Sequence, residues 1–102
     1  MNRGAIHDID LPVGRHPGVI ITRDSAIPVL RHVVVALITS TIRDLPTEVP
    51  VGHDHGLDHD SVVNCDNLFT VPKKALGPRR GQLDPVALRR LRDALTIALE
   101  LD

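Results

Sequence analysis

The segment Val33–Thr41 constrains the fold more than any other part of this chain. It is rich in β-branched residues and contains neither Gly nor Pro, a pattern that predicts a strand buried on both faces. Five shorter segments, rich in aliphatic or β-branched residues, predict further strands around it: Ala5–Leu11, Val19–Arg23, Thr47–Val51, Ser61–Asn64 and Leu68–Val71. The chain is therefore expected to fold around a β-sheet.

The intervening segments contain strong turn formers. Pro12, Gly14, Pro17 and Gly18 predict a rigid, turn-rich loop before the second strand. Ser25–Leu30 is expected to form a short helical turn, and the polar sequence from His53 to Gly56 is expected to form a loop between two strands.

The hydrophobic period changes near the C-terminus. Asp84 is a favourable N-cap and Pro85 suits the first helical position. Leucines then recur at helical spacing and form one apolar stripe, at positions Leu88, Leu91, Leu95 and Leu99. The predicted fold is mostly β with a C-terminal helix packed on a small barrel, in a single domain over residues 1–102.

Composition and charge narrow the functional classes. A single cysteine, Cys65, excludes an internal disulfide and fits a reducing compartment, and the longest apolar run is too short to span a bilayer. We therefore expect a cytoplasmic protein with no membrane association. The net charge is −1, but residues 73–102 carry seven basic and four acidic side chains. That basic end can supply phosphate contacts or be a solvated helix surface.

Short segments along nearly the whole chain resemble the MazF/PemK family of toxin endoribonucleases. The match consists of Arg3-Gly4-x-Ile6, Pro17–Thr22, Ile38–Thr41, Leu45–Val49, Gly56-Leu57, Asp60–Asn64 with Asp66, Thr70-Val71-x-Lys73, and Leu76-Gly77 with Gly81 and Leu83. Each segment alone is a weak signal, but their order and spacing indicate the family. The resemblance implies an SH3-like barrel of the MazF/CcdB type that forms a homodimer.

The resemblance also implies an activity. Family members cut single-stranded RNA at short sequences without a metal or other cofactor, and an antitoxin protein with a disordered segment blocks the RNA groove. The 2′-hydroxyl attacks the adjacent phosphate and leaves a cyclic phosphate and a 5′-hydroxyl. This reaction needs a base, an acid and stabilisation of the charge that develops on the phosphate oxygens.

Thr39 matches the catalytic threonine of the family. Its hydroxyl, at the end of the central strand, is suited to a hydrogen bond with a phosphate oxygen. The alternative interpretation is a β-branched strand residue whose hydroxyl satisfies the backbone.

The catalytic arginine of the family directly precedes the proline of the second strand, and here the sequence departs from the pattern. His16 precedes Pro17, and Arg15 lies one residue earlier. Arg15 can still reach the phosphate with its long, forked side chain, or His16 can act as acid or base, or the enzyme is weakened. We favour Arg15 for charge stabilisation with assistance from His16.

The predicted RNA-binding residues are polar or small: Gly14, Thr22, Ser40, Thr41, Asp66 and Asn67. Asp66 and Asn67 are equally plausible as turn residues. Phe69 is the only aromatic residue, so base stacking is nearly unavailable and sequence selectivity must come from polar groups.

Two alternatives remain at this stage. The histidines His53, His55 and His59 are close enough in sequence to suggest a metal site, although no cysteine accompanies them, and we expect a polar loop and no metal. The rival functions are a non-catalytic gyrase poison of the CcdB type and a degenerate member that only binds its antitoxin.

Overall fold

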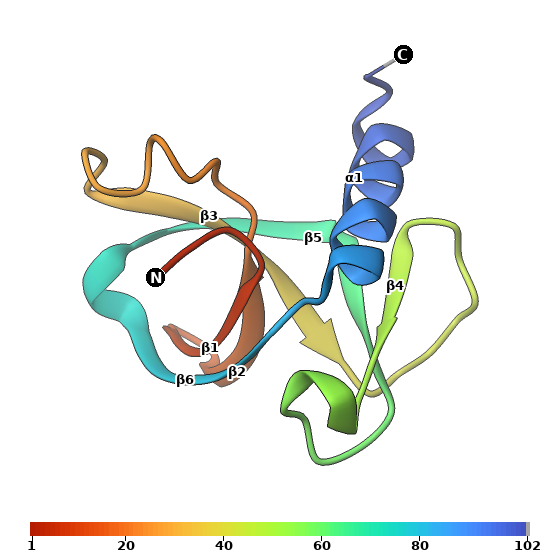
Figure 1. The fold of residues 1–102 in the computed structure, drawn as a ribbon. Helices are drawn as coiled ribbons and strands as arrows, with labels where there is room; N and C mark the ends of the chain where they lie inside the picture. Colours follow the sequence, from red (N-terminus) through yellow and green to blue (C-terminus); the bar gives the residue numbers. More distant parts are fainter. Residues whose placement is uncertain (102) are drawn as a thin grey trace.

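The structure is a computed structural model that describes residues 1–101. It consists of six β-strands, two short 3₁₀ turns and one C-terminal helix (Figure 1). The strands are β1 (Ala5–Leu11), β2 (Gly14–Ile20), β3 (His32–Thr39), β4 (Glu48–Val51), β5 (Ser61–Pro72) and β6 (Leu76–Gln82); the turns are η1 (His53–His55) and η2 (Lys73–Ala75), and the helix is α1 (Pro85–Leu99). The predicted mostly-β fold with a C-terminal helix is confirmed.

The strands form one curved antiparallel sheet in the order β4-β5-β3-β2-β1-β6. The predicted central strand, β3, lies between β2 and β5 and ends at Thr39, two residues earlier than expected. Because β4 and β6 are the two ends of this order, the sheet is an open one that bends toward a barrel.

The predicted loop from Pro12 to Gly18 is wrong. β2 already begins at Gly14, and Leu11 pairs with Gly14, so β1 and β2 form a tight hairpin whose turn is Pro12-Val13. Pro17 is accommodated because β2 pairs with β3 only from Gly18 onward, so Pro17 has a strand neighbour, β1, on one side alone. A proline without an N–H is tolerated where a strand lacks one neighbour.

Two other predictions also need correction. The separate strands expected at Ser61–Asn64 and Leu68–Val71 are one strand, β5, interrupted by an irregularity in its pairing with β3 around residues 65–67. Strand β6 was not predicted from the sequence, because Gly77, Pro78 and Gly81 weaken the strand pattern.

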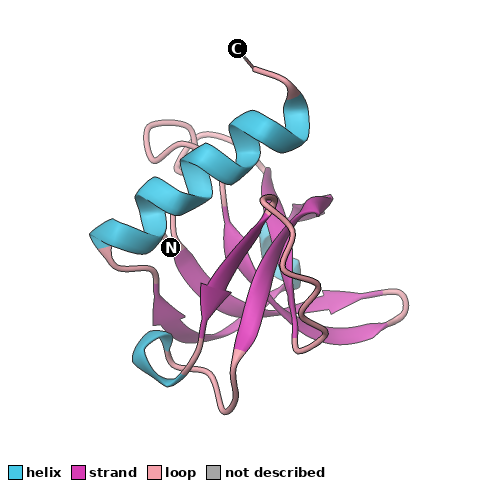
Figure 2. Cartoon of the chain, turned by 90° about the vertical axis from the view of Figure 1, so that its right-hand side faces the viewer, coloured by secondary structure: helices cyan, strands magenta, loops and turns pink. Residues whose placement is uncertain are grey.

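The helix begins as predicted. Asp84 is its N-cap and accepts a hydrogen bond from the backbone N–H of Ala87 (2.8 Å), which lowers the pKa of the Asp84 carboxyl from its usual value. The helix lies across the sheet (Figure 2), and Leu91 and Leu95 belong to the main core cluster. Within residues 1–101, no helix is long and apolar enough to cross a membrane.

A close contact between two backbones brings the β4–β5 connection against β6. A Cβ atom added to Gly81 would overlap the carbonyl of His55, and one added to Gly56 would overlap the carbonyl of Arg80. Gly56 also has a φ of +89°, which favours glycine. His55 accepts the backbone N–H of Gly52 at Nδ1 (3.3 Å), and its Nε2 lies 3.3 Å from Asp84 Oδ2. The close approach of Gly56 and Gly81 takes the place of hydrogen-bonded pairing between β4 and β6, the two end strands of the sheet.

We predict that Gly81→Ala lowers the free energy of unfolding by about 1–3 kcal/mol, the usual cost of overpacking. Urea denaturation measures this change. Gly14→Ala is the comparator: Gly14 has a φ of +124° but open space around its Cβ position, so its cost reflects backbone conformation alone. A Gly81→Ala protein that unfolds at the wild-type urea concentration would show that the two backbones do not need to approach so closely.

Candidate active site

Two of the predicted catalytic residues, His16 and Thr39, lie just beyond the paired part of β2 and β3. Gly18 pairs with Leu37, and the same register extended by two residues sets His16 across from Thr39. Opposed residues in an antiparallel pair project from the same face of the sheet. The His16 imidazole and the Thr39 hydroxyl are therefore neighbours on one face.

His16 and Thr39 line two adjoining pockets. The first, which we call the Arg80 pocket, has a volume of about 340 Å³ and is lined by His16, Pro17, Ile38, Thr39, Ser40, Leu57, Asp58, His59, Ser61 and Arg80. The second, the Arg43 pocket, has a volume of about 270 Å³ and is lined by His16, Leu37, Ile38, Thr39, Thr41, Arg43, Glu48, Asn64 and Asn67. The two pockets together have the size that a small ligand such as a nucleotide occupies.

The Thr39 hydroxyl keeps a proton available. Its oxygen accepts the backbone N–H of Thr41 (3.1 Å), which orients the side chain at the strand end. A hydroxyl has one donor and two acceptor sites, so Thr39 can still donate to a ligand oxygen. Glu48 supports the following loop, because its Oε1 accepts the backbone N–H groups of Arg43 (3.0 Å) and Leu45 (3.3 Å).

Arg15 lies away from this pair. It is one residue from His16 on the same strand, so its side chain leaves the opposite face of the sheet. Its Nε donates to Asp10 Oδ1 (3.0 Å) across the β1–β2 hairpin, and both side chains are more than half exposed. Arg15 is not among the residues that line the two pockets.

Two arginines that the sequence analysis did not place in the site do line the pockets. Arg80 comes from β6, and Arg43 follows the Ile38–Thr41 segment. The only sequence signal for Arg80 was the basic balance of residues 73–102, because nothing local indicated which of seven cations would reach the site.

A comparison with known proteins now identifies the family. The family described as "PemK-like, MazF-like toxin of type II toxin-antitoxin system" matches residues 2–99. The chain belongs to this family. It is 43% identical over 97 residues to Endoribonuclease MazF3 of Mycobacterium tuberculosis H37Rv, covering 95% of this chain and 93% of that protein.

Solved structures of mycobacterial proteins share the fold of this PemK/MazF-like chain. The Mycobacterium tuberculosis toxin MazF-mt6 superposes with a TM-score of 0.91 at 42% identity, over 96% of this chain and 98% of that one. An endoribonuclease in complex with its cognate antitoxin, from a mycobacterial species, superposes with a TM-score of 0.92 at 31% identity, over 100% and 97%.

Of the other predicted RNA-binding residues of this PemK/MazF-like chain, some line the two pockets and others do not. Ser40 lines the Arg80 pocket, and Thr41 and Asn67 line the Arg43 pocket. Asp66 accepts a hydrogen bond from the Thr47 hydroxyl (2.6 Å) beside that second pocket, and its backbone N–H donates to Asn64.

Gly14 and Thr22 line neither pocket. Gly14 lies at the exposed end of the hairpin. The Thr22 hydroxyl accepts the backbone N–H of Val34 (2.8 Å), a contact that supports the start of β3.

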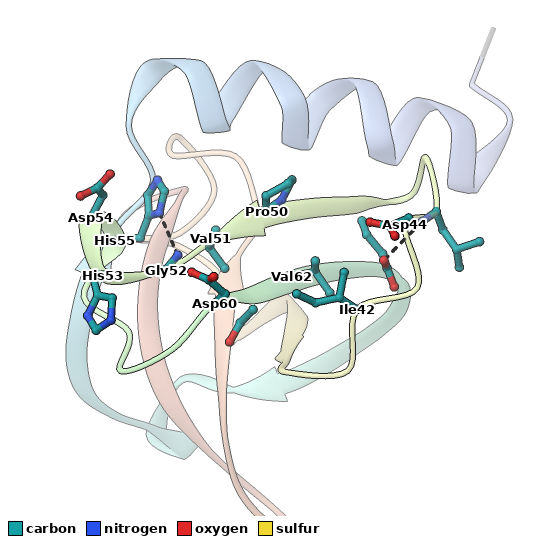
Figure 3. A pocket seen from close by; sticks show the side chains of 13 residues that line it. Ile42, Asp44, Pro50, Val51, Gly52, His53, Asp54, His55, Asp60 and Val62 are labelled. Atoms are coloured by element: carbon teal, nitrogen blue, oxygen red, sulfur yellow. Dashed lines mark hydrogen bonds between the residues drawn. The ribbon is translucent and has the colours of Figure 1, made fainter.

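A larger groove of about 860 Å³ lies beside β4 (Figure 3). Ile42 and Asp44 lie at one end and His53, Asp54 and His55 at the other, and the lining also includes Glu48 and Asp60. Of residues 1–101, no Lys or Arg lines this groove, whereas each of the two smaller pockets contains an arginine, so the smaller pockets are better suited to phosphate. Within the same described residues, no three His, Cys, Asp or Glu side chains are grouped to hold a metal ion.

We predict that the thiol of Cys65 is inert in the folded protein. Burial, with a smaller contribution from the Asp66 carboxylate, raises its pKa to about 11, so almost no thiolate is present at pH 8. A thiol reagent such as Ellman's reagent should not label the native protein at pH 8, and the urea-unfolded protein should react with one equivalent. Rapid labelling of the native protein would contradict the placement of Cys65 in the core.

Proposed function

We propose that this chain is the toxin of a toxin–antitoxin pair and acts as a sequence-specific endoribonuclease on single-stranded RNA in the cytoplasm. The observation that carries the proposal is that His16 and Thr39 both line two adjoining pockets of about 340 and 270 Å³, in a chain of the PemK/MazF-like toxin family. The nucleotides on either side of the cut occupy one pocket each, and the phosphate between them lies against His16 and Thr39.

The reaction is an internal transfer at phosphorus. The 2′-oxygen of the RNA forms a bond to phosphorus, the bond from phosphorus to the 5′-oxygen breaks, and the products are a 2′,3′-cyclic phosphate and a 5′-hydroxyl. The 2′-hydroxyl loses a proton and the departing 5′-oxygen gains one, and His16 is placed for one of these transfers. The Thr39 hydroxyl donates to a nonbridging oxygen as negative charge develops there. The reaction needs no metal.

Polar side chains select the sequence that is cut. Asn64 and Asn67 in the Arg43 pocket have amide groups that pair with base edges, and Arg43 is positioned to meet acceptor atoms or phosphate. Phe69 lines neither pocket, in keeping with the expectation that base stacking contributes little.

The protein works as a homodimer that a cognate antitoxin inhibits. Leu91 and Leu95 of the helical stripe are used by the core, but Ile97, Leu99 and Leu101 at the end of the chain are more than half exposed. Ile42 and Leu45 add partly exposed apolar surface beside β4. Such surface is what a second copy or an antitoxin segment covers.

The activity is tested by incubating the purified protein with a long mixed-sequence RNA in EDTA. We expect cleavage at a short recurring sequence, with new 5′ ends that polynucleotide kinase labels without prior phosphatase treatment. Thr39→Val keeps the shape of the side chain but removes its hydroxyl, and His16→Gln removes the titratable ring. Each variant should reduce the cleavage rate by about 10²–10³-fold.

Thr70→Val is the matched control, because Thr70 is an exposed strand threonine on β5 that lines neither pocket, and it should cut at the wild-type rate. A folded protein that leaves every RNA intact would sink the nuclease proposal and favour a toxin or antitoxin-binding protein without catalysis. Full activity of the Thr39→Val protein would remove this hydroxyl from the reaction.

A further inference from the structure

Arg80 lines the pocket that contains His16 and Thr39, and its guanidinium contacts Asp58 of the same lining, although Arg80 comes from β6 at one end of the sheet order. The close contact of Gly56 with the backbone of Arg80 brings β6 beside the β4–β5 connection, which contributes Leu57, Asp58 and His59 to the same pocket. A long cationic side chain on β6 therefore reaches a site that is built mainly from β2 and β3.

Two carboxylates hold the Arg80 side chain, and they hold it unequally. Its Nη1 lies 3.1 Å from Asp8 Oδ1, and the Asp8 side chain is only 18% exposed. Its Nη2 lies 3.5 Å from Asp58 Oδ2, and the Asp58 side chain is 82% exposed. The Asp8 contact is a sheltered ion pair, whereas an exposed pair at the limiting distance contributes little.

The Asp58 contact is therefore replaceable. A guanidinium has five N–H donors in a fork that matches two oxygens of a phosphate, and Asp8 occupies one side of it. When RNA enters, a phosphate oxygen can take the place of the Asp58 carboxylate, which then returns to water at small cost. Asp8 continues to hold the arginine in position.

We propose that Arg80 is the catalytic cation of this enzyme and stabilises the negative charge on the nonbridging phosphate oxygens as the 2′-oxygen attacks. The guanidinium transfers no proton; it contributes hydrogen bonds and charge in a partly buried site, where both are stronger than in water. This inference rests on the proposed nuclease function and assigns its cationic group. The position before Pro17 then does not need an arginine, and His16 is available for proton transfer.

Arg15 is the competing candidate, and its surroundings favour it less. It is paired with Asp10 at the exposed end of the hairpin, it lines neither pocket, and its side chain is 57% exposed compared with 30% for Arg80. Charge in so open a position is screened by water and salt.

The test uses the wild-type protein, a short RNA that contains the mapped cut, and single-turnover rates at saturating protein. Arg80→Ala should cut about 10²–10³-fold more slowly, as expected when one charge-stabilising donor is lost. Asp58→Asn should cut faster or bind RNA more tightly, because it releases Arg80 from its weaker partner. A purely structural role for Arg80 predicts no gain from Asp58→Asn.

Arg79→Ala is the matched control: Arg79 lies on the same strand, donates to Gln82 Oε1 and the carbonyl of Gly81, and lines neither pocket. It should keep the wild-type rate at saturation. Because Arg80→Ala leaves Asp8 unpaired, Arg80→Ala/Asp8→Asn is made as well, and thermal melting establishes that each variant is folded. Methylguanidinium at millimolar concentration should restore part of the rate of the Arg80 variants but not of Arg15→Ala.

A wild-type rate in a folded Arg80 variant, or a large loss in Arg15→Ala alone, would overturn the assignment. If wild-type protein cuts no RNA, the nuclease proposal fails, and the role of Arg80 is still measured by binding. The affinity for a 2′-O-methyl oligonucleotide should then depend less steeply on salt in Arg80→Ala, by about 0.7 in the slope of log K against log salt. An unchanged slope would show that Arg80 does not contact phosphate.

Discussion

The contact between Gly56 and Gly81 is the constraint on which the site depends. The six strands form an open order, so hydrogen bonding alone does not bring its two ends together. Because Gly56 and Gly81 have no side chains, the backbones of the β4–β5 connection and of β6 approach closely and close the open side of the sheet. The contact of His55 with Asp84 joins the β4–β5 connection to the start of the helix. The connection that follows η1 then forms one wall of the Arg80 pocket, and β6 forms another.

If Arg80 is the catalytic cation as proposed, this closure explains how an unusual sequence can keep a complete site. The family pattern expects an arginine beside the proline of β2, and this chain has His16 there. The fold brings a different arginine, from β6 at one end of the strand order, to the pocket that His16 and Thr39 share. In this proposal Arg80 supplies the positive charge that the reaction needs, and His16 transfers the proton. The larger groove beside β4 is lined by four carboxylates and no Lys or Arg of the described residues, so it is less suited to phosphate than the two pockets that contain an arginine.

Much of this fold could be predicted from local patterns. The β-branched run predicted β3, and the Asp84-Pro85 pair predicted the start of α1, because both signals come from neighbouring residues. The hairpin of β1 and β2 and the strand β6 were missed, because their prolines and glycines are tolerated only in the tertiary setting. The same limit applies to the site. The family motif indicated Thr39, and its arginine position led to the prediction of Arg15 with His16. The place of Arg80 depends on a contact between segments 25 residues apart, which no local pattern contains.

The most direct test of the account is the crystal structure of the wild-type protein with an RNA whose attacking 2′-hydroxyl is replaced by a 2′-O-methyl group. The account predicts that the phosphate at the cut accepts hydrogen bonds from the Thr39 hydroxyl and the Arg80 guanidinium, with His16 beside the 2′-oxygen. Asp58 should have moved away, while Asp8 remains on Arg80. A phosphate bound to Arg15 at the hairpin, with Arg80 still held by both carboxylates, would contradict it.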